Sequence, residues 1–146
     1  MTTGLDQLNE LFKKTRESHN EAERLRAEAA EASRKAVEAE RSGDLDLAWK
    51  QWHDTKLLLV QRGQILEWPS EDIALVDSSI HLKLANILRK EKNHNLALAH
   101  IIYWANGGRR RQLKMYTDKL RTYFNRCKFK STPLDEALHC SNSDLI

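Results

Sequence analysis

An uninterrupted stretch of helix-forming residues near the start of this chain limits the folds that it can adopt. Residues 5–41 contain neither proline nor glycine and are rich in Ala, Glu, Arg and Lys. Apolar residues recur at steps of three and four, which predicts an amphipathic helix of more than thirty residues. Thr15 and His19 lie where a core would have leucine, so we expect firm packing at both ends of this helix and weaker packing between. Its apolar stripe consists of Leu5, Leu8, Phe12, Ala22, Leu25, Ala29, Ala32, Ala36 and Ala39.

Shorter helices are predicted to follow, separated by brief breaks. Gly43 suits the left-handed position after a helix end, and Asp44 can cap the next helix. Glycine and proline are scarce, at five and two residues, and no segment is a convincing strand. The predicted fold class is therefore all-α, with about five helices in antiparallel hairpins. After the long N-terminal helix they are expected at about 45–66, 73–88 with a kink near 77–79, 96–104 and 109–127.

Two stretches of the sequence align as similar helical hairpins. Residues 34–55 read RKAVEAERSGDLDLAWKQWHDT, and residues 83–104 read KLANILRKEKNHNLALAHIIYW. A small residue in each helix allows close approach, and a large residue four positions after the second alanine fills the wedge between the helices. The matched pairs are Ala36 with Ala85, Gly43 with Lys92, Ala48 with Ala97, and Trp52 with Ile101.

This pattern resembles the tetratricopeptide repeat. That family has a small residue in its first helix, a Gly-Asp type of turn, an alanine in its second helix and an aromatic residue four positions later. Residues 42–52, SGDLDLAWKQW, match the second half of that motif. The two units are 97 − 48 = 49 residues apart, against about 34 in the family, and the second has no glycine at its turn. A repeat-like array and a closed five-helix bundle both fit the sequence.

The resemblance implies that a protein or peptide binds on the inner face of the first helix of each hairpin. In the second hairpin the matching inner positions are Asn86, Arg89 and Lys90. An amide with nearby cations could hold a chain-end carboxylate or an acidic peptide through charge-assisted hydrogen bonds. The alternative is that Arg89 and Lys90 are ordinary solvated side chains.

The fifth helix is predicted to carry a strongly basic surface. Nine basic residues and one acid lie between Asn106 and Ser131, whereas the whole chain has a net charge of +3. Such a patch could bind an acidic protein or a phosphate backbone, so nucleic-acid binding is the alternative function. The aromatic residues of this helix have helical spacing on its apolar face, which favours core packing over base stacking. The cations of the predicted patch are Arg109, Arg110, Arg111, Lys114 and Arg121.

No motif of an enzyme or a metal site occurs in the sequence. It has no glycine-rich phosphate loop, nucleophile elbow or His-Glu metal helix, so we expect no catalytic residues, no metal and no cofactor. The predicted function is that of a non-enzymatic helical module of the adaptor or chaperone kind. Its expected partner is an acidic protein or peptide. Self-association as a homodimer, through the long N-terminal helix or exposed tryptophan, is a further alternative.

Features of export and membrane insertion are missing from the sequence. The first residues have no apolar stretch of signal-peptide length, and no run approaches the roughly 18 apolar residues of a membrane span. The two cysteines do not form a metal-type pair and fit a reducing compartment. We expect a cytoplasmic protein without membrane contact, with one helical domain over residues 1–130 and a flexible polar tail over 131–146.

Overall fold

The computed structural model describes residues 3–108 and 113–127, and every regular element within them is an α-helix. The predicted all-α class and the long N-terminal helix are therefore confirmed. The predicted third helix is divided at Ile80 into two helices, close to the kink expected near residues 77–79. The helices are α1 (Gly4–Ser42), α2 (Leu45–Ile65), α3 (Ser70–Ser79), α4 (His81–Lys90), α5 (His94–Gly108) and α6 (Leu113–Cys127).

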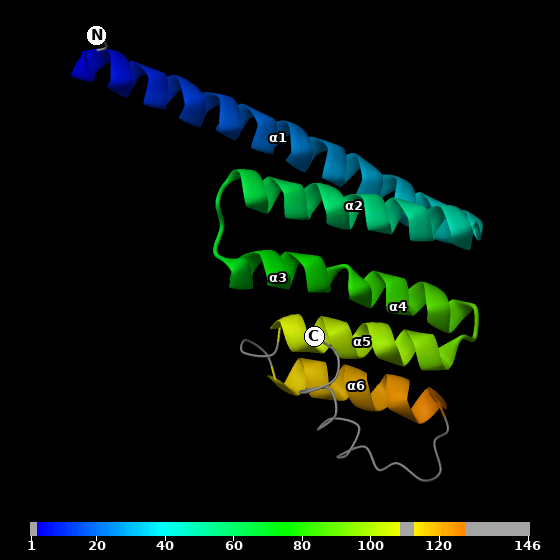
Figure 1. Ribbon diagram of the computed structural model, residues 1–146. Coiled ribbons are helices and arrows are strands. Elements are labelled where there is room, and N and C mark those ends of the chain that lie inside the picture. Colours follow the sequence, from blue (N-terminus) through cyan, green and yellow to red (C-terminus); the bar gives the residue numbers. More distant parts are fainter. Residues whose placement is uncertain (1–2, 109–112, 128–146) are drawn as a thin grey trace.

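These helices form an open stack (Figure 1). α1 packs on α2, α2 packs on the consecutive pair α3 and α4, α5 packs on that same pair, and α6 packs on α5. α1 and α6 consequently lie on opposite sides of the molecule. In the part of the chain that the structure describes, the hairpins are thus stacked side by side and do not close into a bundle.

Two groups of buried residues hold the stack together, and α4 contributes to both. The first joins α1, α2 and α4, where fully buried Ala36 and Ala48 allow close approach and Trp52 fills the space beside them. The second joins α4, α5 and α6 around the fully buried Ile101. The aligned alanines of the second hairpin, Ala85 and Ala97, are buried as completely as those of the first.

The turns after α1 and α4 share one backbone geometry. Gly43 has a φ of 84° and Lys92 a φ of 62°, both in the left-handed region. In each turn the next backbone N–H donates to the carbonyl five residues earlier, at 2.9 Å after α1 and 2.8 Å after α4. This arrangement satisfies carbonyls that the helix end would leave unpaired. The second turn therefore matches the first although lysine replaces glycine.

The N-terminal end of α1 does not pack as the sequence suggested. α1 has 39 residues and α2 has 21, so α1 extends well beyond the end of its neighbour. The buried residues of α1 begin at Ala22. The expectation of firm packing at both ends is wrong at the N-terminus, because α2 ends at Ile65 and no described helix covers the rest. The predicted tail, 131–146, lies outside the described residues.

Candidate functional site

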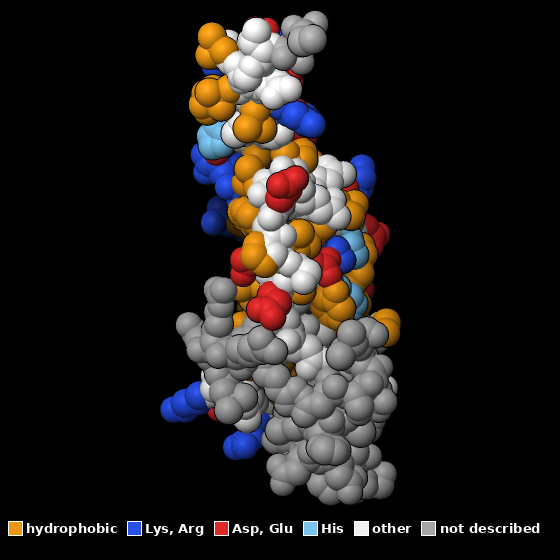
Figure 2. Space-filling view, turned by 60° about the vertical axis from the view of Figure 1, so that its left-hand side comes forward, with side chains coloured by type: hydrophobic (Ala, Val, Ile, Leu, Met, Phe, Trp, Pro, Cys, Tyr) orange, Lys and Arg blue, Asp and Glu red, His pale blue; other side chains and the backbone are white. Residues whose placement is uncertain are grey.

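The N-terminal arm, defined as residues 4–20 of α1, carries an apolar face that no described helix covers. All of its side chains are exposed except that of Ser18, which is half-buried. Hydrophobic side chains (orange) appear along this projecting end at the top of Figure 2. Thr3 and Asp6 form a reciprocal capping box at the start of the arm, which favours a helix up to its first turn. Its large apolar residues and their exposed fractions are Leu5 66%, Leu8 45%, Leu11 59% and Phe12 57%.

The apolar face of the arm continues the buried stripe of α1. Leu8, Leu11, Thr15 and Ser18 precede Ala22 at alternating steps of three and four, which is the spacing of one helix face. From Ala22 onward this stripe is buried in the α1–α2 hairpin, whereas before it the same face meets solvent. The arm therefore presents the surface of a packed helix with no described helix packed on it.

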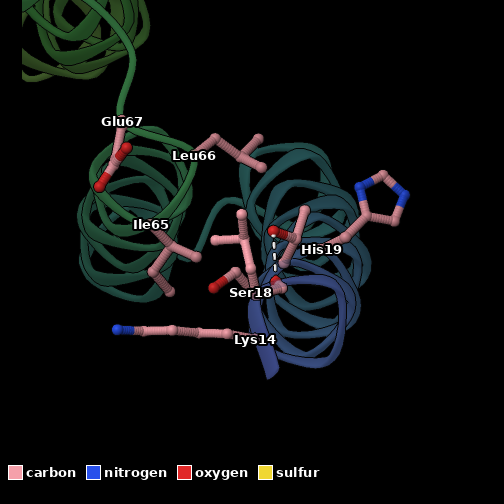
Figure 3. A pocket seen from close by; sticks show the side chains of 8 residues that line it. Lys14, Ser18, His19, Ile65, Leu66 and Glu67 are labelled. Atoms are coloured by element: carbon pink, nitrogen blue, oxygen red, sulfur yellow. Dashed lines mark hydrogen bonds between the residues drawn. The ribbon is translucent and has the colours of Figure 1, made fainter. Parts of the chain in front are cut away.

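A groove of about 380 Å³ lies where the arm passes the end of α2 (Figure 3). The side chains of Ser18 and Ile65 point toward one another across it. Glu67 has a φ of 56° in the turn that ends α2 and adds a carboxylate to the rim of the groove. The groove is lined on the α1 side by Leu11, Lys14, Thr15, Ser18 and His19, and at the end of α2 by Ile65, Leu66 and Glu67.

Charge is divided along the arm. Its first half, residues 4–11, has two acids and no base, and its second half, residues 13–20, has three bases and one acid. The first half thus carries −2 and the second +2. No ion pair found among the described residues involves these side chains. The acids are Asp6, Glu10 and Glu17, and the bases are Lys13, Lys14 and Arg16.

The predicted binding residues Asn86, Arg89 and Lys90 lie together at the end of α4, and they have partners within the protein. Arg89 donates from Nε and Nη2 to Oδ1 of Asn86, at 3.1 and 2.7 Å. Lys90 Nζ lies 3.5 Å from Oε1 of Glu40, and Trp52 Nε1–H donates to the other oxygen of that carboxylate at 3.3 Å. The Lys90–Glu40 contact joins α4 to the first hairpin. An incoming carboxylate would have to compete with Glu40 for Lys90.

The basic surface of the predicted fifth helix is described only in part. Arg109, Arg110 and Arg111 lie outside the described residues. Lys114 and Arg121 are exposed on α6 and, being seven residues apart, share a face two turns from each other. The aromatic side chains of α6 belong to the core, as their spacing predicts: Tyr116, Tyr123 and Phe124 are all buried.

A cluster of titratable side chains connects α2, α3, α4 and α5. Lys56 Nζ lies 3.3 Å from Oδ1 of Asp77 and 3.3 Å from Nε2 of His81. The hydroxyl of Tyr103 donates to the same carboxylate, and the Nδ1 atoms of His81 and His100 are 2.8 Å apart. His100 is half-buried, and its hydrogen-bond partner lies within the protein. The rest of the cluster could not be recognised from the sequence, because its members are spread over residues 56–103.

The hydrogen bonds of this cluster require both histidines to be neutral. Lys56 can only donate, so Nε2 of His81 accepts, and the proton on Nδ1 of His81 is donated to Nδ1 of His100. Burial, and then the charge of Lys56, lowers the pKa of His81 to about 4. Burial also lowers the pKa of His100. The hydrogen bond to Asp77 raises the pKa of Tyr103 to about 12. These are features of a structural network between helices.

Comparison with known protein families, with curated proteins and with solved structures finds no match to this chain. Across residues 3–108 and 113–127, no group of three or more His, Cys, Asp or Glu side chains is placed to hold a metal ion. Within the same ranges, no helix combines the length and apolarity needed to cross a membrane. Function is therefore inferred from the surfaces described above.

Proposed function

We propose that this protein is a non-enzymatic helical module that binds another protein chain, with the N-terminal arm as its binding surface. The observation that carries the proposal is the uncovered apolar face formed by Leu5, Leu8, Leu11 and Phe12. Burying one leucine or phenylalanine side chain stabilises a complex by roughly 1.5–3 kcal/mol, so four on one helix face favour association strongly.

The arm is suited to a helical partner. Its apolar residues have the spacing of a helix-packing stripe, and the groove beside Ile65 and Leu66 offers a second wall at the end of α2. An amphipathic helix laid along the arm would contact both surfaces at once. The arm would then pack on its partner helix in the same way that α2 packs on the remainder of α1.

Two other surfaces receive less support from the structure. Asn86, Arg89 and Lys90 remain a candidate site for an acidic peptide, although the two cations already have partners within the protein. Nucleic-acid binding rests on a basic patch of which the structure describes only Lys114 and Arg121. The arm combines uncovered apolar side chains with a groove among the described residues.

Site-specific photo-crosslinking in cells tests the proposed function. A benzoylphenylalanine placed at Leu8 is expected to give an adduct of defined mass, because this side chain would lie inside the interface. The matched control places the same residue at Glu17. Nine residues at about 100° each put Glu17 on the opposite face of the helix, where little adduct is expected. No adduct from Leu8, or equal adducts from both positions, would contradict the proposal.

A further inference from the structure

We infer that the partner of the arm is a second copy of this chain, whose own arm packs antiparallel to the first about a two-fold axis near Leu11 and Phe12. This inference rests on the proposed function, because it names the occupant of the same surface. Two features carry it: the distribution of charge along the arm and the direction of α2.

The charges of the arm are complementary to themselves only in the antiparallel orientation. The acidic half of one arm then lies beside the basic half of the other, whereas a parallel pair would place like charges together. In an antiparallel pair centred near residue 12, positions whose numbers add up to about 24 lie opposite one another. Glu10 is then level with Lys14 of the second copy along the helix axis, and Asp6 lies within one helical turn of the level of Arg16.

The charges act through the electric field along the arm and not as contact pairs across the apolar seam. At about 100° per residue, Lys14 and Arg16 lie nearer to the apolar face than the acids do. Asp6 and Glu10 lie on the far face, because they are seven residues from Lys13 and Glu17 respectively. The antiparallel orientation is therefore favoured by the opposite net charges of the two halves of the arm.

The end of α2 provides a binding position for the N-terminal residues of the second arm. α2 runs antiparallel to α1 and ends at Ile65, so an antiparallel arm from a second copy would begin where α2 stops and continue in its direction. Its first apolar residues would enter the groove beside Ile65 and Leu66. The positive N-terminal end of that helix would then meet the negative C-terminal end of α2 and the Glu67 carboxylate, which is a favourable arrangement of dipoles.

Sedimentation equilibrium of the purified full chain tests whether the pair forms. The expected mass is twice the 17.0 kDa of one chain, with dissociation on dilution. Replacement of both Leu8 and Leu11 by alanine should raise the dissociation constant by about 100-fold or more, because the two-fold axis removes four leucines from the seam. The matched control, Lys13→Ala with Glu17→Ala, alters the opposite face without changing net charge and should leave the dimer intact.

Cysteine crosslinking tests the orientation. With Cys127 and Cys140 replaced by serine, Gln7→Cys and Ser18→Cys chains are mixed. The antiparallel pair brings residue 7 of one copy beside residue 18 of the other, so the mixture should give a mixed crosslinked dimer. Each chain alone should crosslink poorly. Efficient crosslinking of Gln7→Cys with itself would indicate a parallel pair and overturn the inference.

The outcomes separate this inference from the proposed function. A chain that stays monomeric at every concentration, but whose Leu8 photo-adduct contains a different protein, overturns self-pairing and leaves the proposed function standing. A monomer that gives no adduct overturns both. A dimer that persists unchanged in the Leu8→Ala/Leu11→Ala chain overturns self-pairing through the arm.

Discussion

Lys92 occupies a backbone conformation that glycine adopts most easily. Its φ of 62° matches the left-handed geometry of Gly43, whose φ is 84°. A side chain in this region costs roughly 1 kcal/mol, which glycine avoids. We expect Lys92→Gly to raise the free energy of unfolding by up to about 1 kcal/mol and Gly43→Ala to lower it by a similar amount. Urea unfolding of both variants measures the two predicted changes in stability. A Lys92→Gly chain less stable than the original would contradict the prediction.

His81 should make the stability of the protein depend on pH. Its pKa is about 4 in the folded protein and ordinarily 6.5, so between these values the unfolded chain binds a proton that the folded protein does not accept. The stabilisation is therefore complete above pH 6.5 and is lost as pH falls toward 4. Because one pKa unit corresponds to about 1.4 kcal/mol, we expect His81 to account for a loss of about 1–3 kcal/mol over this range.

Urea unfolding of a His81→Gln chain between pH 7 and pH 4 measures this contribution. The variant should lose less stability on acidification than the original protein. Some dependence should remain, because the pKa of His100 and that of His53 are also lowered, chiefly by burial. His19→Gln is the matched control, since His19 is exposed on the arm. Identical pH profiles for the original and the His81→Gln chains would show that His81 does not contribute to the loss of stability on acidification.

The packing of α3 on α5 depends on the absence of a side chain at Gly107. A Cβ built there would lie 1.7 Å from Oγ and 2.3 Å from Cβ of Ser78, far inside van der Waals contact. We expect Gly107→Ala to destabilise the protein by about 1–3 kcal/mol, because this clash outweighs the roughly 1 kcal/mol that alanine adds to helix propensity. Thermal and urea unfolding would measure the loss.

A double-mutant cycle identifies the cause of that loss. Combining Gly107→Ala with Ser78→Gly removes both clashing atoms, so the double variant should be less destabilised than the two single changes together predict. Gly4→Ala is the control, since no atom lies within 4 Å of a Cβ at that position. If the two changes in the free energy of unfolding are simply additive, α3 and α5 move apart at this point and the predicted clash is not the cause of the loss.

At the scale of elements, the α1–α2 hairpin was predictable because its signals are local. Gly43 takes the left-handed conformation, and the side chain of Asp44 accepts the Leu47 N–H at 3.1 Å as the cap of α2. The role of Gly107 was not predictable. The sequence suggests a helix stop at residues 106–108, and α5 does end at Gly108, but Gly107 lies within the helix and allows α3 to approach.

In the whole molecule, the difference in length between packed helices decides which apolar surface stays exposed. α1 is almost twice as long as α2, so part of its stripe must stay uncovered once the two pack together. The lengths of both helices are predictable from the sequence, and the difference between these lengths was the signal from which the arm could have been recognised. The groove could not be predicted from helix lengths, because it depends on which residues at the end of α2 lie beside Thr15 and Ser18 of α1.

The helical class, the long first helix and the turn at Gly43 follow from the sequence alone, since helix periodicity and capping are properties of neighbouring residues. Three outcomes required the folded structure: the helices form an open stack, Arg89 and Lys90 have internal partners, and Lys56 and Asp77 meet the histidines. Those outcomes depend on contacts between residues far apart in the chain. The apolar N-terminal end of α1 depends on both sequence and tertiary structure. Its apolar stripe is visible in the sequence, and the exposure of that stripe follows from the point at which α2 ends.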